Sequence, residues 1–275
     1  MSCEVLLPGG MAVSCRQKHE VPLVLLEVQS YFSNGVRLNA GDTMFDVGAN
    51  IGLFSLAAYQ HCDRDLRIFA FEPVTAIFEL LQANCERNTR KPHVNVFRCG
   101  LSHRSGTANL AYYPRAPVLS TAYPDREADL RLLKQIVVNS LIHLAEAPVA
   151  LRCLRWVPRM MREPLVDYVL RKALVPVTAP CEMRTLSEVI AEYGVGRIDL
   201  LKVDVEKAEL DVLNGIAGED WPKIQQVVVE VHDLDHRVET IKRLLTAAGL
   251  SSISVDQPPT LKDTNIFTIF ATRNR

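Results

Sequence analysis

The chain has 275 residues, of which 48% are hydrophobic and 23% are charged, and its formal net charge is -1. This composition excludes wholesale disorder, and the small net charge excludes a global field that would recruit nucleic acid or an anionic membrane. Seven scattered cysteines, without a Cys-x-x-Cys pair, argue against a disulfide framework or a zinc site. Residues 1–18 lack signal-peptide features, and no apolar run approaches the roughly 20 residues that span a bilayer. We therefore expect a cytoplasmic protein with reduced thiols.

Strand-like and helix-like runs alternate along most of the chain. The expected strands are residues 43–47, 67–71, 94–97, 198–203 and 226–231, and the expected helices are residues 51–61, 75–88, 207–215 and 238–248. Near the end, residues 252–255 and 265–272 are expected to form an antiparallel pair at the sheet edge. This alternation predicts an α/β fold in which helices cover both faces of a largely parallel sheet.

The segment 112–180 interrupts this alternation. Prolines divide it, and helical runs are expected at residues 129–145 and 165–174. One helix normally connects the third strand to the fourth, so the segment is longer than the connection needs. We interpret it as a helical insertion that acts as a lid; a second independent domain is the alternative. The core would then comprise residues 36–111 and 181–275, and residues 1–35 would pack on the core or the active site.

A glycine-rich turn, Asp-Val-Gly-Ala-Asn-Ile-Gly at residues 46–52, follows the first expected strand and opens a helix. Glycine lets the backbone approach a ligand without a clashing Cβ, and a helix N-terminus adds amide donors. A dinucleotide site favours Gly-x-Gly-x-x-Gly, whereas here Asn50 replaces the second glycine. The carboxylate of Asp46 suits an ammonium group and repels a pyrophosphate. The turn therefore favours S-adenosylmethionine (SAM) over NAD. Its candidate cofactor-binding residues are Asp46, Gly48, Ala49, Asn50 and Gly52.

Two further segments are candidates for contact with the nucleoside part of such a ligand. Glu72 and Pro73 follow the second strand, where an acid can accept hydrogen bonds from both ribose hydroxyls. After the third strand, Gly100, Leu101 and Ser102 could place backbone and a hydroxyl beside the adenine ring. These two segments are expected to complete the cofactor site.

Five stretches of the chain resemble the FkbM-type methyltransferases, a branch of the class I SAM-dependent enzymes. They are residues 45–54 (FDVGANIGLF), 69–73 (FAFEP), 184–186 (RTL), 198–206 (IDLLKVDVE) and 228–232 (VVEVH). The resemblance extends over about residues 36–273 outside the insertion. It implies a Rossmann-like, seven-stranded sheet with SAM at the carboxyl ends of the strands, and O-methylation as the usual activity.

The resemblance has one departure and one refinement. Lys207 stands where many members have glycine after the acid. The insertion, with Ser-Thr-Ala-Tyr-Pro-Asp at residues 120–125, resembles that of members that work in polyketide or nonribosomal peptide pathways. The resemblance therefore implies a small-molecule acceptor, a hydroxyl on a natural-product intermediate that is sometimes tethered to an acyl or peptidyl carrier protein.

Acids and a histidine end the fourth and fifth strands. The period of two along a strand places Lys202, Asp204 and Glu206 on one face, and it does the same for Glu230 and His232. Methyl transfer to an alcohol needs an aligned donor and acceptor and removal of a proton. We expect His232 to be the general base, because an ordinary pKa of about 6.5 leaves it largely neutral near pH 7. Glu206 or Glu230 would orient it, and Asp204 would line the methionine end of SAM or position the acceptor.

A divalent cation is the alternative use of these acids. Asp204, Glu206, Glu230, His232 and Asp233 together could hold such an ion, which would acidify the acceptor hydroxyl. We favour catalysis without a metal.

Basic residues gather in the second half of the insertion. They are Arg152, Arg155, Arg159, Arg162, Arg171 and Lys172. The stretch predicts either a solvated face or a docking site for an acidic carrier protein or an anionic substrate; no nucleic-acid or membrane partner is expected. A non-catalytic SAM-binding protein and an NAD-type oxidoreductase remain as alternatives to the O-methyltransferase, the latter disfavoured by Asn50.

Overall fold

The computed structural model describes residues 3–273 except positions 8, 17, 19, 34, 91–92, 143–155 and 259–260. Its central sheet has seven strands in the order β11-β12-β10-β9-β3-β4-β5. The strands are β3 (Thr43–Val47), β4 (Arg67–Phe71), β5 (Val94–Phe97), β9 (Leu200–Val203), β10 (Gln226–His232), β11 (Ser252–Asp256) and β12 (Ile266–Thr272). The strand β12 runs antiparallel to both of its neighbours, β10 and β11, and the pairs from β10 through β5 are parallel. The expected seven-stranded α/β fold is confirmed.

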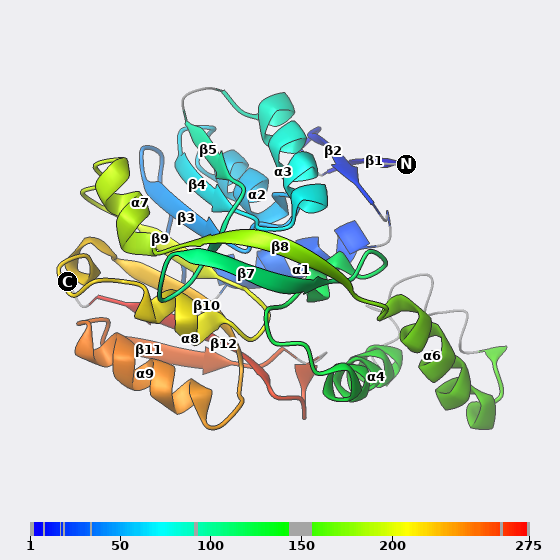
Figure 1. Ribbon diagram of the computed structural model, residues 1–275. Helices are drawn as coiled ribbons and strands as arrows, with labels where there is room; N and C mark the ends of the chain where they lie inside the picture. The colour runs from blue at the N-terminus through cyan, green and yellow to red at the C-terminus, as the bar shows by residue number, and fades with distance from the viewer. Residues whose placement is uncertain are drawn as a thin grey trace.

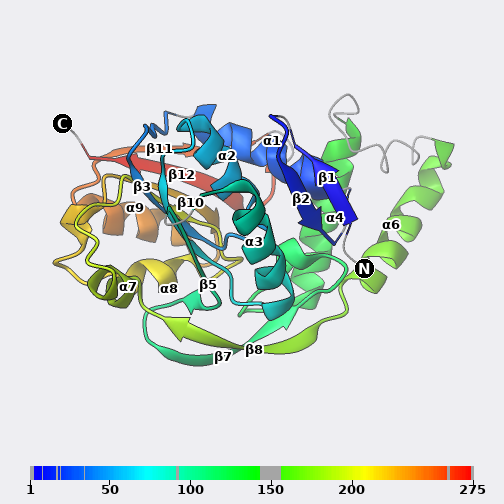
Figure 2. The same ribbon diagram turned by 90° about the horizontal axis from the view of Figure 1, so that it is seen from above.

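Helices cover both faces of the central sheet (Figures 1 and 2). One layer consists of α1 (Glu20–Ser33), α2 (Leu53–His61) and α3 (Thr75–Asn88), and the other of α7 (Leu186–Glu192), α8 (Glu209–Asn214) and α9 (Arg237–Ala247). Side chains of β3 point alternately to the two layers. Met44 packs against the layer of α1, α2 and α3, and Phe45 and Val47 pack against the layer of α7, α8 and α9. Because both faces are covered, the central strands are apolar almost throughout.

A second, three-stranded sheet lies beside the layer of α7 and α8 in Figure 2. It consists of β6 (Gly100–Leu101), β7 (Gly106–Tyr112) and β8 (Val177–Arg184), in the order β6-β8-β7. The sequence did not predict β7 and β8, because both are largely exposed and Pro180 interrupts the pattern of β8. The strands β7 and β8 pair antiparallel, so the ends of the segment between them are held together.

The segment between β7 and β8 contains the short helix η1 (Pro117–Leu119) and the helices α4 (Arg126–Ile142) and α6 (Arg159–Ala173). Helices α4 and α6 pack on each other at one side of the molecule (Figure 1). Tyr113, Leu130 and Leu174 form a small apolar core of their own beneath them. The boundaries expected at residues 112 and 180 fall at the end of β7 and inside β8.

The N-terminal residues form a hairpin of β1 (Cys3–Leu6) and β2 (Ala12–Cys15) that lies against α3. Asn84 fixes it: its amide nitrogen donates to the Ser14 carbonyl at 2.9 Å, and its oxygen accepts from the Ser14 amide at 2.6 Å. The short helix η3 (Trp221–Lys223) precedes β10. Among the described residues, no helix has both the length and the apolar character needed to cross a bilayer.

Candidate active site

A cavity of about 390 Å³ opens at the carboxyl ends of β3, β4, β9 and β10. Its polar lining comes mostly from the last residues of these strands and from the loops that follow them. Apolar lining comes from α1, the η1 region and α4. These apolar residues are Val21, Val24, Val28, Tyr31, Pro117, Val118, Leu133 and Ile136. A ligand in this cavity therefore meets charged groups on one side and hydrocarbon on the other.

The loop after β3 is shaped by backbone contacts with both neighbouring strands. The amides of Gly48 and Ala49 donate to the carbonyl of Phe71 at 3.1 and 2.9 Å. Gly48 has a φ of +78°, and a Cβ at this position would lie 1.8 Å from the carbonyl oxygen of Asp204. Glycine is therefore required here both by the torsion and by the close approach of the next loop.

Asp46 lies behind this loop, outside the lining of the cavity. It is fully buried; its Oδ2 accepts from the Ser55 hydroxyl at 2.6 Å, and its Oδ1 lies 3.3 Å from Nζ of Lys202. The same Nζ donates to the Gly48 carbonyl at 3.0 Å and lies 3.2 Å from Oδ2 of Asp204. Asp46 therefore holds the loop through Lys202, which differs from the direct contact with a ligand ammonium group that we expected.

Glu72 lines the cavity at the end of β4. Its side chain accepts from the Val74 amide at 2.9 Å. Burial raises the pKa of this carboxyl to about 7, against the opposing effect of the Val74 and Asn50 amides. An acid in this place can accept hydrogen bonds from the two hydroxyls of a ribose.

The expected cofactor residues divide into two groups. Those that line the cavity are Gly48, Ala49, Asn50, Glu72, Pro73, Gly100, Leu101 and Asp204. Asp46, Gly52 and Ser102 lie outside it: Gly52 precedes α2 and faces Leu81, and the Ser102 amide donates to the Arg184 carbonyl at 2.8 Å. The lining fits SAM, because it offers a close backbone approach at Gly48, an acid for a ribose and a carboxylate for an ammonium group.

Three carboxylates gather where β9 and β10 end. Oxygens of Asp204, Glu206 and Glu230 lie within 4.8 Å of one another, and all three residues line the cavity. Asp233 does not join them, because its Oδ1 accepts from the Val238 amide at 3.0 Å. Of the five residues considered for a cation, these three acids are thus brought together.

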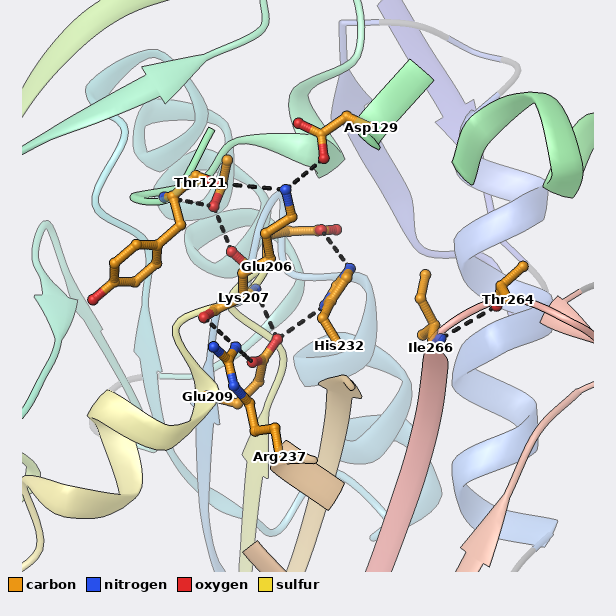
Figure 3. A network of polar contacts seen from close by, with 10 residues as sticks. Thr121, Asp129, Glu206, Lys207, Glu209, His232, Arg237, Thr264 and Ile266 are labelled. Atoms are coloured by element: carbon orange, nitrogen blue, oxygen red, sulfur yellow. Dashed lines mark hydrogen bonds and ion pairs between the residues drawn. The ribbon is translucent and has the colours of Figure 1, made fainter. Parts of the chain in front are cut away.

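His232 occupies a different place from the one expected (Figure 3). It is buried beside a second cavity of about 40 Å³, between two acids. Its Nε2 lies 3.3 Å from Oε2 of Glu206, and its Nδ1 lies 3.0 Å from Oε1 of Glu209. Burial alone would lower the pKa of His232, but the two carboxylates outweigh it and raise the pKa far above the ordinary value. The two flanking carboxylates therefore favour the imidazolium form of His232, with both ring nitrogens as donors, over the neutral base that the sequence suggested.

Glu209 and Arg237 are members of this network that the sequence analysis missed. Glu209 is fully buried, accepts from the Lys207 amide at 2.7 Å, and pairs with Arg237 at 3.0 Å as well as with His232. Burial works to raise its pKa, but its contacts with His232 lower it below the ordinary value. Glu209 therefore takes the orienting place at His232 that had been considered for Glu230. The sequence offered one signal for Glu209, which is an acidic residue in the first turn of the helix expected at residues 207–215.

Glu206 lies at the junction of this network and the cavity. Burial raises its pKa above the ordinary value, and the contact with His232 offsets part of that rise. Its carbonyl accepts from the Thr121 hydroxyl at 2.5 Å. Glu206 and Lys207 both have positive φ, +50° and +77°, which is why α8 begins at Glu209 rather than at the expected residue 207.

The comparisons with known proteins agree with this geometry. The family model of the methyltransferase FkbM domain matches residues 172–250. The 31-O-demethyl-FK506 methyltransferase FkbM of Streptomyces tacrolimicus is 35% identical over 97% of this chain and 95% of its own length. The AMB antimetabolite synthetase AmbE of Pseudomonas aeruginosa is 33% identical over 98% of this chain, which corresponds to 12% of that longer protein.

A solved structure shares the fold. The methyltransferase FkbM from Methylobacillus flagellatus superposes with a TM-score of 0.51 at 15% identity, over 86% of this chain and 45% of that one. The strand order, the antiparallel β12 and the cavity at the strand ends together describe a class I methyltransferase, and both family and fold imply SAM as the cofactor. The chain belongs to the FkbM methyltransferase family.

Proposed function

We propose that the protein transfers the methyl group of SAM to a hydroxyl oxygen of a small-molecule natural-product intermediate. The observation that carries this proposal is the place of Glu206, a half-buried acid with a raised pKa at the wall of the cofactor cavity. The name of the Streptomyces relative supports an oxygen acceptor, because that enzyme methylates a demethylated oxygen position of its substrate.

The residues of the cavity have separable tasks. SAM, when bound, supplies a methyl group on a positively charged sulfur. Glu72 would hold the ribose, and Asp204 would attract the ammonium group of SAM. The loop that begins at Gly48 would contact the nucleoside through its own backbone. These contacts fix the donor for an in-line displacement, in which alignment supplies much of the rate.

Glu206 is the general base in this proposal. Its carboxylate takes the proton of the acceptor hydroxyl as the new oxygen–carbon bond forms and the sulfur–carbon bond breaks. A carboxylate with a raised pKa is a stronger base than an exposed one, so the shift favours this role. The imidazolium of His232 would hold Glu206 in place from behind and would not exchange protons with the acceptor.

The test is transfer of a labelled methyl group from SAM. The purified protein is incubated with 31-O-demethyl-FK506 and with a panel of hydroxylated polyketide and peptide intermediates, and products are located by mass spectrometry. Labelled product with the methyl on oxygen is expected, and a product methylated on nitrogen or carbon would contradict the proposal. Binding of SAM without transfer to any member of a broad panel would favour the non-catalytic alternative.

We also propose that the insertion, residues 112–180, is a lid over the acceptor and that the acceptor is presented on a carrier protein. The match inside a much longer synthetase supports a carrier-bound acceptor. Arg152 and Arg155 lie outside the described residues, and the side chain of Arg159 is not among those described. Arg171 pairs with Asp167 and Glu127. Because the charge of Arg171 is already paired, docking would depend on the other basic residues of this stretch, Arg155 and Arg159 among them.

Carrier docking predicts a salt-dependent interaction. Affinity for an acyl carrier protein is measured at low and high salt, for the wild type and for charge reversals at Arg155 and Arg159. Weakening by salt and by the reversals is expected. Binding that neither salt nor reversal affects would contradict a docking site on the basic stretch.

A further inference from the structure

Lys207 has a backbone conformation that glycine would adopt more readily. Its φ is +77°, and it follows Glu206, which also has a positive φ. The main-chain contacts of Lys207, a donation from its amide to Glu209 and an acceptance at its carbonyl from Arg237 at 2.5 Å, need no side chain. A glycine could make all of them without the steric cost of a Cβ. The side chain of Lys207 must therefore explain why lysine stands here.

The Lys207 side chain reaches into the insertion (Figure 3). Its Nζ lies 2.5 Å from Oδ1 of Asp129 and donates to the Tyr123 carbonyl at 3.3 Å. The side chains of Lys207 and Asp129 are only 8% and 14% exposed. An ion pair so far removed from water is screened little, and the loss of one member leaves the other charge uncompensated. This pair therefore joins the loop after β9 to the first turn of α4.

The same face of α4 forms part of the cavity wall. Leu133 and Ile136 follow Asp129 by four and seven residues, which places all three on one side of the helix. Leu133 and Ile136 line the main cavity, and Glu206, the residue before Lys207, lines it as well. Leu133 and Ile136 also line the second cavity, the one of about 40 Å³ beside His232, together with Asp129 and Lys207. The position of this wall relative to Glu206 is thus fixed through the ion pair.

We propose that Lys207 is a positioning residue that sets the distance between the α4 wall of the cavity and Glu206. Its ion pair with Asp129 holds α4 against the strand end, and the left-handed backbone at Lys207 aims the side chain at α4. That the α4 wall contacts the methyl acceptor is part of the proposed function. The coupling between Lys207 and α4 does not depend on the proposed function.

The experiment measures hydrogen–deuterium exchange in peptides from α4, with and without S-adenosylhomocysteine. The variants are Lys207→Gly, Lys207→Met and Asp129→Asn, together with the exchanged pair K207D/D129K. Lys134→Met is the matched control, because Lys134 lies on the same helix but pairs with Asp167 of α6 instead of with a residue near the end of β9. Thermal unfolding of each variant separates a local effect from a global one.

We expect amide exchange in α4 to rise about tenfold or more in the three single variants at the pair, and to stay near the wild-type rate in Lys134→Met. Lys207→Gly should lower the unfolding temperature less than Lys207→Met, because glycine suits the left-handed backbone and offsets part of the cost of leaving Asp129 unpaired. The exchanged pair should return α4 toward wild-type protection, since aspartate tolerates positive φ better than most residues. Affinity for S-adenosylhomocysteine should change by less than about threefold.

Unchanged α4 exchange in Lys207→Gly and Lys207→Met would overturn the proposal. So would a loss of protection that runs through the whole protein in parallel with the unfolding temperature and is not restored by the exchanged pair. Failure of the wild type to bind S-adenosylhomocysteine would count against the proposed function alone, because the exchange in the ligand-free protein reports on the ion pair independently.

Discussion

Nε2 of His232 lies 3.3 Å from Oε2 of Glu206, so the histidine joins an acid at the cavity wall to a network behind it. The other ring nitrogen contacts the fully buried Glu209. With both nitrogens engaged by carboxylates, the ring has no lone pair to accept a proton. In the proposed reaction the base is therefore Glu206, and His232 is the residue that holds it.

Glu206→Gln tests this assignment, because glutamine keeps the size and the hydrogen-bonding oxygen but cannot take a proton. We expect kcat to fall by about a hundredfold or more, while affinity for S-adenosylhomocysteine changes by less than about threefold. The measurement is labelled-methyl transfer at saturating SAM, paired with calorimetry. Glu206→Gln that turns over at a near-normal rate would remove Glu206 as the base.

His232→Gln should destabilise the protein, because it removes one of the two positive partners of the buried Glu209 carboxylate and leaves only Arg237. A loss of about 3 kcal/mol is expected from breaking a buried pair of this kind. The raised pKa of His232 means that its contribution is fully present below pH 6.5 and declines as the pH rises toward the folded-state pKa. The lowered pKa of Glu209 means that its contribution is present above pH 4.5 and is lost as the pH falls.

The free energies of unfolding of the wild type and His232→Gln, measured with urea, should therefore differ most between pH 4.5 and 6.5. The difference should be smaller toward pH 9. A difference that grows steadily with pH would show that the histidine is neutral in the folded protein, contrary to the geometry described above.

Glu72→Gln should separate stability from cofactor binding. The pKa of Glu72 is raised from 4.5 to about 7, so its protonated form stabilises the fold below pH 4.5 and that stability is lost as the pH rises through 7. At pH 8 the ligand-free variant should be more stable than the wild type by up to about 3 kcal/mol, and the two should converge near pH 4.5. Its affinity for S-adenosylhomocysteine should nevertheless fall about tenfold or more, because charged hydrogen bonds to the ribose are lost.

Thermal unfolding across this pH range, with and without ligand, checks both halves of that expectation. A variant that binds S-adenosylhomocysteine as tightly as the wild type would contradict the role of Glu72 at the ribose.

Methyl transfer should persist in excess chelator. Asp204, Glu206 and Glu230 lie close enough together to hold a cation, but the imidazolium of His232 competes for Glu206. We expect less than about a twofold change in rate after treatment with EDTA, as for a base-catalysed transfer. Loss of activity in chelator, with recovery on adding Mg²⁺, would instead support the cation-assisted reaction.

The central sheet and much of the cavity could be predicted from the sequence, because each depends on local pattern. Buried parallel strands give apolar runs, and the glycine-rich turn is visible in the sequence, although the steric reason for Gly48 is visible only in the structure. The usual topology of such folds places β4 and β9 on either side of β3. The acids after these strands, Glu72 and Asp204, were therefore expected to lie at the same edge of the sheet.

The roles of the buried charges could not be predicted in the same way. Lys202 neutralises Asp46 behind the loop, and Glu209 reaches His232 from a helix that begins two residues later than expected because of the left-handed backbone before it. These pairings depend on side-chain directions that a strand period does not specify. The strands β7 and β8 were missed because their exposure and Pro180 hide the alternating pattern.

Calorimetric titration of the purified wild type with S-adenosylhomocysteine, alongside Glu72→Gln and NAD, tests most directly whether the cavity at the strand ends is a SAM site. The account predicts one site per chain for S-adenosylhomocysteine, clear weakening in Glu72→Gln and no binding of NAD. Equal affinity of the wild type and Glu72→Gln, or preference for NAD, would contradict it.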